Sequence, residues 1–334
     1  MRLAIFSTKS YDRESFSKIN QDFNHQLTFF EAPLNKDTVN LTVDHEAICV
    51  FVNDRLNKET IEKLSENDIK LIALRCAGFN NVDVAAAAEQ GMKVVRVPAY
   101  SPYAVAEHAV ALILTLNRKT HKAFNRIRET NFSLERLSGF DLYGKTVGVI
   151  GTGTIGKVFI RIMRGFGCQV YAYDKFPSDE LKKEGLEYLE MNDLLSTSDI
   201  ISLHCPLTPE TLHLINKESI AHMKRGTMLI NTSRGGLINT KDIIKALKHG
   251  KIGYLGIDVY EQEENLFFKD LSESIIQDDQ IMRLMTFPNV LITAHQGFFT
   301  TEALNQIGTV TLQNLKDFEK GEELHNEVTP DMVK

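Results

Sequence analysis

An arginine, a cluster of glutamates and a histidine each follow a short apolar segment in the C-terminal half of the chain. Arg234 comes soon after residues 228–230, the glutamates Glu261, Glu263 and Glu264 follow 254–257, and His295 follows 290–292. An arginine guanidinium can bind a carboxylate through two hydrogen bonds, and a histidine can donate a proton near neutral pH. A neighbouring carboxylate favours the protonated imidazole and fixes its orientation. Hydride transfer to a 2-oxo acid needs these residue types from a protein.

Each of these residues also has an ordinary structural explanation. Arg234 could be a surface residue of a turn, and His295 could make purely structural hydrogen bonds. The glutamates could form a solvated acidic loop, and spacing alone does not choose among the three of them. Asp258, at the end of its apolar segment, could instead face the nicotinamide side of a site.

A glycine-rich sequence upstream of these residues is typical of a dinucleotide site. The apolar segment 146–150 runs into Gly151-Thr152-Gly153-Thr154-Ile155-Gly156, a helical pattern follows, and Asp174 ends the next predicted strand. The first glycine permits the tight turn, the second lets the backbone approach a pyrophosphate, and the third lets the helix pack on the sheet. The acid can bind the adenosine ribose and would repel a 2′-phosphate, which favours NAD over NADP. Lys175 could partly offset that preference, although a surface lysine is the commoner explanation.

These candidate residues need a scaffold, and apolar segments alternate with helical patterns along most of the chain. The predicted strands are 3–6, 47–52, 71–74, 94–97, 146–150, 170–173, 200–203, 228–230, 254–257 and 290–292. The predicted helices include 58–67, 84–89, an apolar helix 104–117 that continues into a polar stretch up to residue 129, 156–166 and 301–320. Alternating strands and helices predict parallel sheets covered by helices. The acidic segment 261–279 is expected to be a loop.

Length and composition limit the class of protein. A chain of 334 residues favours two domains, and a net charge of −6 argues against a nucleic-acid or anionic-membrane surface. No window approaches the ~18 apolar residues of a membrane span, and the N-terminal apolar run is too short for a signal peptide. The four scattered cysteines, Cys49, Cys76, Cys168 and Cys205, argue against a zinc site or a disulfide framework. We therefore expect a cytoplasmic protein with reduced thiols and no metal.

The chain resembles the D-isomer-specific 2-hydroxyacid dehydrogenase family over nearly its whole length. The resemblance rests on several motifs taken together, namely Arg75–Asp83, Val97–Tyr100, Gly144–Gly156, His204–Thr208, Asn231–Gly235, Gly256–Glu261 and the segment around His295. It implies an α/β fold of two doubly wound parallel-sheet domains, one flavodoxin-like and one a Rossmann domain, with an active-site cleft between them. The substrate domain would comprise residues 1–100 and 300–334, and the NAD-binding domain, residues 101–299, would be inserted between them.

The resemblance also implies roles for individual residues. Arg234 would bind and polarise the substrate, Glu263 would be the partner of the histidine, and His295 would be the acid/base. The substrate would also contact backbone N–H groups of Ala77 and Gly78 and the rings of Tyr100 and Phe298. The cofactor-binding residues would be Gly151, Gly153, Thr154, Ile155, Gly156, Asp174, Cys205, Pro206, Thr211, Thr232, Ser233 and Asp258. Two positions depart from the family pattern, since Thr211 stands where asparagine is common and Gly236 replaces a bulkier residue.

Within the family, the resemblance is strongest to fermentative members that form D-lactate, which implies reversible reduction of pyruvate with NADH. The same mechanism could act on a larger 2-oxo acid, although Tyr100, Phe298 and Phe299 would leave less room for a side chain. The chain could instead be an NAD-sensing binding protein, because fold and function are not tied together. The apolar helix 104–117 is a candidate subunit interface, and a homodimer or homotetramer is expected by analogy.

Overall fold

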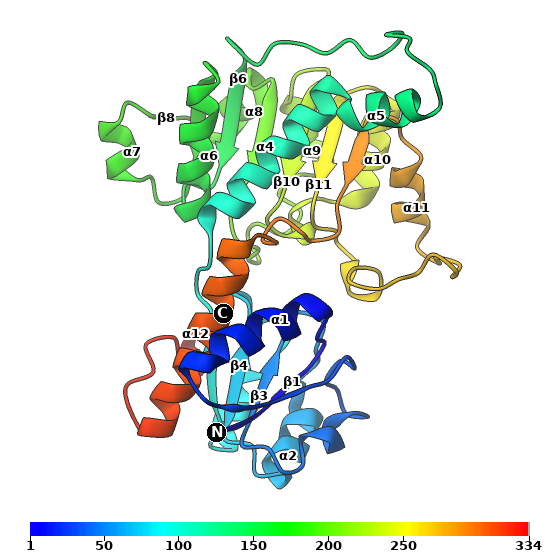
Figure 1. Ribbon diagram of the computed structural model, residues 1–334. Helices are drawn as coiled ribbons and strands as arrows, with labels where there is room; N and C mark the ends of the chain where they lie inside the picture. The colour runs from blue at the N-terminus through cyan, green and yellow to red at the C-terminus, as the bar shows by residue number, and fades with distance from the viewer. Residues whose placement is uncertain (333–334) are drawn as a thin grey trace. The chain divides into compact units, whose positions relative to one another are not determined.

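The computed structural model describes residues 1–332, which form two compact units. One unit combines Met1–Ser101 with the described residues from Phe298 onward, and the other comprises Pro102–Gly297. The chain thus leaves the first unit after its fifth strand and returns to it with its last long helix, as the colours in Figure 1 show. Each unit is built on its own parallel sheet, which confirms the predicted pair of parallel-sheet α/β domains. No helix among the described residues is long and apolar enough to cross a membrane.

The first unit has a five-stranded sheet in the order β2-β1-β3-β4-β5, with all neighbours parallel. Its strands are β1 (Arg2–Ile5), β2 (Gln26–Phe29), β3 (Ala47–Val50), β4 (Leu71–Leu74) and β5 (Lys93–Arg96). Its helices are α1 (Ser10–Ile19), α2 (Lys58–Glu66), α3 (Val84–Glu89) and α12 (Thr301–Lys320), with 3₁₀ turns η1 (Asn20–Asp22), η2 (Val39–Thr42) and η5 (Pro330–Met332). Every residue of β3 and β4 is buried, as central strands of a covered parallel sheet require. α12 packs beside α1, from the opposite end of the chain (Figure 1).

The second unit has a seven-stranded parallel sheet in the order β12-β11-β10-β9-β6-β7-β8. Its strands are β6 (Thr146–Ile150), β7 (Gln169–Tyr173), β8 (Glu187–Tyr188), β9 (Ile200–Leu203), β10 (Thr227–Asn231), β11 (Ile252–Ile257) and β12 (Val290–Ile292). Its helices are α4 (Pro102–Arg118), α5 (Thr120–Arg128), α6 (Thr154–Gly165), α7 (Asp179–Lys183), α8 (Met191–Thr197), α9 (Lys217–His222), α10 (Thr240–Lys248) and α11 (Asp279–Met285), with 3₁₀ turns η3 (Gly235–Leu237) and η4 (Glu263–Asn265). The strand order reverses between β6 and β9. Ligands bind beyond the carboxyl ends of strands at such a switch point.

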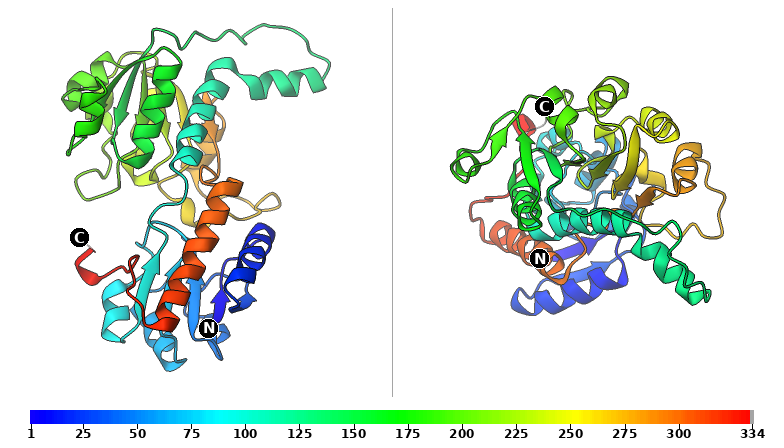
Figure 2. Two further views of the ribbon diagram at one scale, coloured as in Figure 1. Left: turned by 60° about the vertical axis from the view of Figure 1, so that its left-hand side comes forward. Right: turned by 90° about the horizontal axis from the view of Figure 1, so that it is seen from above.

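The long apolar helix predicted after residue 104 is two helices. α4 buries apolar side chains, among them Leu112, Ile113 and Leu116, within its own unit against α6, β10 and β11. Lys119 then adopts φ 52°, in the left-handed region, and α5 starts at Thr120. No side chain of α5 is buried, and Figure 2 shows α5 and the loop after it extending away from the seven-stranded sheet. The prediction of one continuous helix was therefore wrong.

The predicted strands coincide with observed strands to within two residues at each end. Two observed strands have no predicted counterpart. β2 is an edge strand with half-exposed side chains, and β8 has only two residues, so neither produces an apolar run. α6 begins at Thr154, two residues earlier than predicted, because the helix starts directly on the glycine loop.

Candidate active site

Arg234 lies in a tight turn after β10, at the carboxyl edge of the seven-stranded sheet. The buried Asn231 holds this turn. Its side-chain oxygen accepts a hydrogen bond from Ser233 N–H at 3.0 Å, and its amide donates to the backbone oxygen of Arg234 at 2.9 Å. Gly235 is required next, because a Cβ there would lie 2.1 Å from backbone atoms of Tyr260. The turn therefore places Arg234 beside the chain that follows β11.

Glu263 and His295 are in direct contact. Glu263 opens η4 after β11, and His295 follows β12. Oε1 of Glu263 lies 2.9 Å from Nδ1 of His295. Oε2 of Glu263 accepts a hydrogen bond from the backbone N–H of Tyr260 at 2.9 Å. Glu261, by contrast, bonds to His213 and not to His295. The two side chains of the Glu263–His295 pair retain 24% and 20% exposure, so solvent and small molecules can reach them.

The backbone of His295 adopts a conformation that non-glycine residues rarely take. Its φ is 52°, in the left-handed region, which costs about 1–3 kcal/mol and persists only where the surrounding structure enforces it. Its N–H donates to the backbone oxygen of Asp258 at 2.7 Å. The N–H groups of Gln296 and Gly297 donate to the Asp258 carboxylate at 2.9 and 2.8 Å. Asp258 therefore fixes three consecutive residues of the segment that carries the histidine.

The Asp258 carboxylate is almost completely buried, with 1% of the residue exposed. Its Oδ1 also accepts a hydrogen bond from the Thr293 hydroxyl and lies 3.3 Å from Nε2 of His108 in α4. Burial raises the pKa of Asp258, but hydrogen bonds from His108 and Thr293 lower it by more, so the net shift is downward. The family resemblance implies that Asp258 lines the cofactor cleft, and this stays a prediction. In the structure its carboxylate is bonded to the His295 segment and to α4.

The glycine loop has the local geometry that a dinucleotide requires. Gly151 has φ 98°, and a Cβ there would lie 2.6 Å from the backbone of His204. A Cβ on Gly156 would lie 2.1 Å from the Gly151 carbonyl oxygen. Gly153 differs, because a Cβ there would meet no atom of residues 1–332 within 4 Å. The space at Gly153 is open, whereas the other two glycines are packed by the protein itself.

The first turn of α6 is ready to bind an anion. Gly153 is the N-cap, and no side chain within the described chain caps this end. The N–H groups of Thr154 and Ile155 therefore lie at a helix N-terminus beside the open space at Gly153. Such an end attracts phosphate through its N–H groups and the positive end of the helix dipole. These residues fit the pyrophosphate of NAD.

Asp174 follows β7 and is bonded to the glycine loop. Its Oδ2 accepts hydrogen bonds from the backbone N–H and the hydroxyl of Thr152 at 2.6 and 2.9 Å. The Tyr188 hydroxyl donates in turn to Thr152 at 3.0 Å. Lys175 is exposed, and its ammonium lies 6.0 Å from the centre of the Phe176 ring. An acid at the end of the second strand of a Rossmann unit stands where the adenosine ribose binds.

The remaining predicted cofactor residues lie in turns after β9 and β10. The Ser233 hydroxyl donates to the backbone oxygen of Cys205 at 2.7 Å, which ties the two turns together. Thr211 donates to the backbone oxygen of Pro206 at 2.7 Å and so closes its own loop. Thr232 has a buried hydroxyl without a hydrogen-bond partner among residues 1–332. An unsatisfied hydroxyl at the switch point is a position that a bound ligand can satisfy.

The predicted substrate contacts of the first unit fall into two groups. Ala77 and Gly78 lie in the turn after β4, where the Ala77 carbonyl oxygen accepts a hydrogen bond from Arg96 at 2.8 Å. Phe298 and Tyr100 lie together, with ring centres 6.2 Å apart, and a third ring, that of Phe51, has its centre 6.0 Å from that of Phe298. The unit therefore has an aromatic cluster that the sequence indicated only in part.

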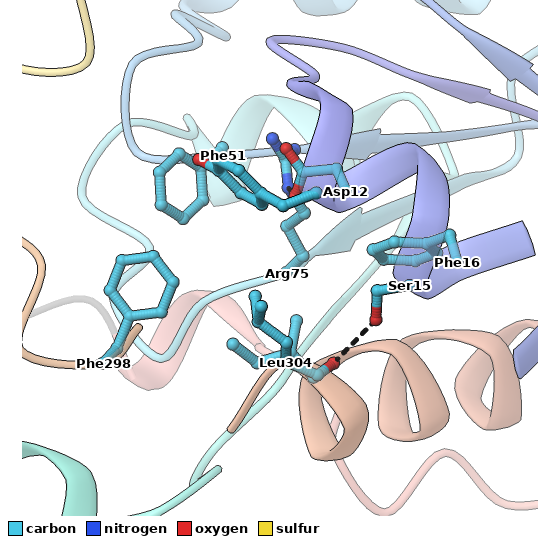
Figure 3. A pocket seen from close by; sticks show the side chains of 9 residues that line it. Asp12, Ser15, Phe16, Phe51, Arg75, Phe298 and Leu304 are labelled. Carbon is cyan, nitrogen blue, oxygen red and sulfur yellow. Dashed lines mark hydrogen bonds and ion pairs between the residues drawn. The ribbon is translucent and has the colours of Figure 1, made fainter. Parts of the chain in front are cut away.

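Phe298 also borders a pocket inside the first unit (Figure 3). The side chain of Arg75, 3% exposed, lines the same pocket and pairs with Asp12 of α1 at 3.4 Å. The guanidinium lies over the Phe51 ring, 4.7 Å from its centre. Because Arg75 directly precedes the turn of residues 76–78, this buried ion pair fixes the base of that turn. The sequence motif that contains Arg75 thus has a structural explanation.

Several residues that hold the site were not predicted from the sequence. Asn231 could have been found, since an asparagine whose side chain accepts from the backbone N–H two residues on forms a recognisable turn. His108 and Thr293, joined at 2.9 Å, are separated by 185 residues, so no local pattern connects them. The same holds for His213 and Glu261, which are 48 residues apart.

Comparisons with known proteins agree with this geometry. A model of the NAD-binding domain of D-isomer-specific 2-hydroxyacid dehydrogenases matches residues 110–297. The D-lactate dehydrogenase of Escherichia coli (strain K12) is 52% identical over 328 residues, which are 98% of this chain and 100% of that protein. A structure of the pyruvate reductase of Chlamydomonas reinhardtii superimposes with a TM-score of 0.94 at 47% identity and covers 98% of both chains. A structure of D-2-hydroxyisocaproate dehydrogenase has a TM-score of 0.87 at 32% identity and covers 98% of this chain and 100% of that one.

The family model spans more than half of the chain, and the identity to full-length relatives is far above the level at which only a fold is shared. The matched range includes both the glycine loop and the Glu263–His295 pair. The chain therefore belongs to the D-isomer-specific 2-hydroxyacid dehydrogenases and is an NAD-dependent enzyme of that family.

Proposed function

We propose that this enzyme is a D-lactate dehydrogenase that reduces pyruvate with NADH. The observation that carries the proposal is the contact of Glu263 with Nδ1 of His295 in the same unit as Arg234. The relatives named for D-lactate and for pyruvate are 52% and 47% identical to this chain, whereas the D-2-hydroxyisocaproate dehydrogenase is 32% identical. This difference supports pyruvate over a larger 2-oxo acid.

The proposed mechanism divides three tasks among three side chains. NADH, when bound at the glycine loop, supplies the hydride that goes to the keto carbon. His295 donates the proton that goes to the keto oxygen, from Nε2, because Nδ1 faces Glu263. Glu263 favours the protonated imidazole before the transfer and fixes the orientation of the ring. Arg234 binds the carboxylate and stabilises the negative charge that develops on the oxygen.

We assign the pyrophosphate to the turn Gly151–Gly156, the adenosine ribose to Asp174, and the rest of the cofactor to the turns that carry Cys205 and Thr232. The backbone N–H groups of Ala77 and Gly78 would bind the substrate carboxylate. The Tyr100 and Phe298 rings would surround the methyl group of pyruvate.

We also propose that the chain forms a homo-oligomer and that α5, not α4, makes the contact between subunits. α4 already buries its apolar side chains inside its own unit. α5 and the loop after it expose Phe124, Ile127, Phe132 and Leu134, with between 55% and 82% of each residue accessible. Monomeric proteins rarely expose so many large apolar side chains together. A second copy of the chain is the partner that closed symmetry favours.

The substitution His295→Gln tests the proposed chemistry. Glutamine keeps a hydrogen-bonding side chain of similar size but cannot donate a proton as an acid. We expect kcat for pyruvate reduction to fall at least ~10³-fold, while the Kd for NADH, measured by fluorescence titration, stays within about twofold. Unchanged turnover would remove His295 from the mechanism. Wild-type enzyme that binds NADH but reduces neither pyruvate nor 2-oxoisocaproate would point to a binding protein instead.

The substrate is tested by comparing kcat/KM for pyruvate with that for 2-oxoisocaproate. We propose that the ring cluster of Phe51, Tyr100 and Phe298, with neighbouring centres 6.0 and 6.2 Å apart, limits the size of the substrate side chain. We expect pyruvate to be favoured by roughly 100-fold or more. Equal values would contradict the assignment to pyruvate without affecting the acid/base roles.

A further inference from the structure

A second glutamate–histidine pair lies two residues before Glu263. Glu261 Oε1 is 2.6 Å from Nε2 of His213. Its Oε2 accepts hydrogen bonds from the hydroxyl and the backbone N–H of Thr240 at 2.8 and 3.2 Å. Burial raises the pKa of Glu261, but the hydrogen bonds from His213 and Thr240 lower it by more, so the carboxyl stays ionised at neutral pH. One carboxylate therefore joins the turn after β9, the start of α10 and the segment after β11.

The backbone that Glu261 holds also orients Glu263. The N–H of Tyr260, the preceding residue, donates to Oε2 of Glu263 and leaves Oε1 for His295. A shift of residues 260–261 would therefore rotate the Glu263 carboxylate away from the imidazole. The two contacts are coupled because the donor, Tyr260, and the anchored residue, Glu261, are adjacent in the chain.

The same backbone touches the turn that carries Arg234. A Cβ on Gly235 would lie 2.4 Å from the backbone nitrogen of Glu261, so the two segments are packed against each other without side chains between them. On the other side, the backbone N–H of His213 donates to the Gly236 oxygen at 2.8 Å. Glu261 and His213 thus enclose the Arg234 turn from two directions.

His213 adopts a backbone conformation that most side chains avoid. Its φ is 52°, the same value as for His295. A glycine or an asparagine would adopt this conformation at lower cost. In this conformation the histidine reaches Glu261 and forms a charge-assisted hydrogen bond with its carboxylate.

We propose that Glu261 and His213 are positioning residues of the reaction, which hold the segment after β11 so that Glu263 meets His295. Neither side chain is assigned to substrate or cofactor. The pair also connects the acid/base residues to the turn of residues 205–211, where the proposed cofactor contacts Cys205 and Thr211 lie. The inference rests on the proposed roles of Glu263 and His295. Breaking the pair leaves all three reacting side chains in the protein but loosens the contact between Glu263 and His295.

The direct test is the pKa of the His295 imidazole, measured by NMR on histidine-labelled enzyme without substrate, with the signal assigned from His295→Gln. Glu263→Gln removes the charged neighbour of the ring and serves as the reference for complete loss of the contact. Glu261→Gln, Glu261→Ala and His213→Gln should each change the measured His295 pKa in the same direction as Glu263→Gln does, but by a smaller amount. In a Glu263→Gln background, Glu261→Gln should change it no further, because the contact that it supports is already lost.

The exposed pair of Glu323 and His325, 3.8 Å apart, supplies a matched control. Glu323→Gln removes the same charge from a histidine partner and should leave the His295 pKa unchanged. An unchanged His295 pKa in both folded Glu261 variants would overturn the inference, since a purely structural role would lower the melting temperature without moving this pKa. The inference would also be overturned if Glu261→Gln changed the His295 pKa equally in the wild-type and Glu263→Gln backgrounds.

Kinetics supply a second readout that separates this inference from the proposed function. Reduction needs protonated His295, so kcat/KM falls above its pKa, and Glu261→Gln should move that fall to lower pH. We expect kcat at neutral pH to drop roughly 10-fold, as small misplacements of catalytic groups do. A shifted His295 pKa in an enzyme that does not reduce pyruvate would refute the proposed substrate and support the positioning role.

Discussion

At the scale of single residues, the site depends on a histidine whose backbone is held in place against its preference. The left-handed conformation of His295 persists because Asp258 accepts three backbone hydrogen bonds from this segment. Its carboxylate accepts from the N–H groups of Gln296 and Gly297, and its backbone oxygen accepts from the N–H of His295. The two carboxylate oxygens accept these hydrogen bonds most strongly in the ionised form, because protonation converts one acceptor into a donor. The position of the acid/base residue is thus linked to the charge of a buried aspartate that touches no proposed reacting atom.

Asp258→Asn should destabilise the enzyme by about 2–4 kcal/mol at neutral pH, because two or more charge-assisted hydrogen bonds are lost in a buried place. The folded-state pKa of Asp258 lies below its ordinary value of 3.8. Its contribution to stability is therefore complete above about pH 5 and is lost as the pH falls below that ordinary value. Urea unfolding at a series of pH values measures this directly. The difference between wild type and variant should be constant from about pH 5 to 8 and narrow on further acidification, whereas a constant difference in acid would contradict the account.

The residues that sequence alone could identify are those whose chemistry is local. Arg234 and His295 stand directly after strands, and Gly151 opens the glycine loop, so type and position pointed to them. Glu263 could not be separated from Glu261 by spacing, because the choice depends on which histidine each one meets. Those histidines, His213 and His295, come from different turns of the fold.

At the scale of elements, the β6–α6 loop contains glycines in two different environments. Gly156 is packed against the carbonyl of Gly151, so its lack of a side chain serves the structure. Gly153 is surrounded by open space in the described chain, and its φ of −66° is accessible to alanine. No contact among the described residues explains why position 153 lacks a side chain, whereas the close approach of a bound cofactor would explain it.

Gly153→Ala and Gly156→Ala should consequently fail in different ways. Gly156→Ala places a Cβ against a carbonyl oxygen and should lower the melting temperature by several degrees, as a change of about 2 kcal/mol does. Gly153→Ala should keep the wild-type melting temperature and weaken NADH binding at least ~10-fold, because the methyl group occupies the approach of the pyrophosphate. Differential scanning calorimetry without cofactor and NADH titration measure the two effects. Tight NADH binding by Gly153→Ala would place the pyrophosphate elsewhere.

Strands could be predicted wherever burial produces an apolar run, as in β3, β4 and β9, whose residues are all buried. The end of α4 could not. Lys119 has no intrinsic preference for the left-handed region, and the polar helical pattern continues beyond it. The break is stabilised by contacts that lie far away in sequence, since the Lys119 ammonium donates to backbone oxygens of residues 136 and 138.

At the scale of the whole molecule, helices cover the sheet of each unit, and one group of exposed large apolar side chains lies on α5 and the loop after it. Phe124 and Ile127, 62% and 55% exposed, are three residues apart and therefore share a face of the helix. Phe132 and Leu134 in the following loop are more exposed still. A helix with no buried residue has little reason to be stable unless another surface covers it.

If that surface is a second copy of the chain, the double substitution Phe124→Ser, Ile127→Ser should convert the oligomer into a smaller species. Each large apolar side chain at the centre of an interface contributes roughly 2 kcal/mol, so the pair should raise the dissociation constant by about 10²–10³-fold. Sedimentation velocity over a range of concentrations measures the change. Ile275, 86% exposed in another loop of the same unit, provides the control, because Ile275→Ser removes a comparable apolar surface and should leave the sedimentation coefficient unchanged. An oligomer that survives the double substitution with unchanged affinity would exclude α5 as its interface. A wild-type protein that sediments as a monomer at all concentrations would leave the apolar face of α5 to a different partner.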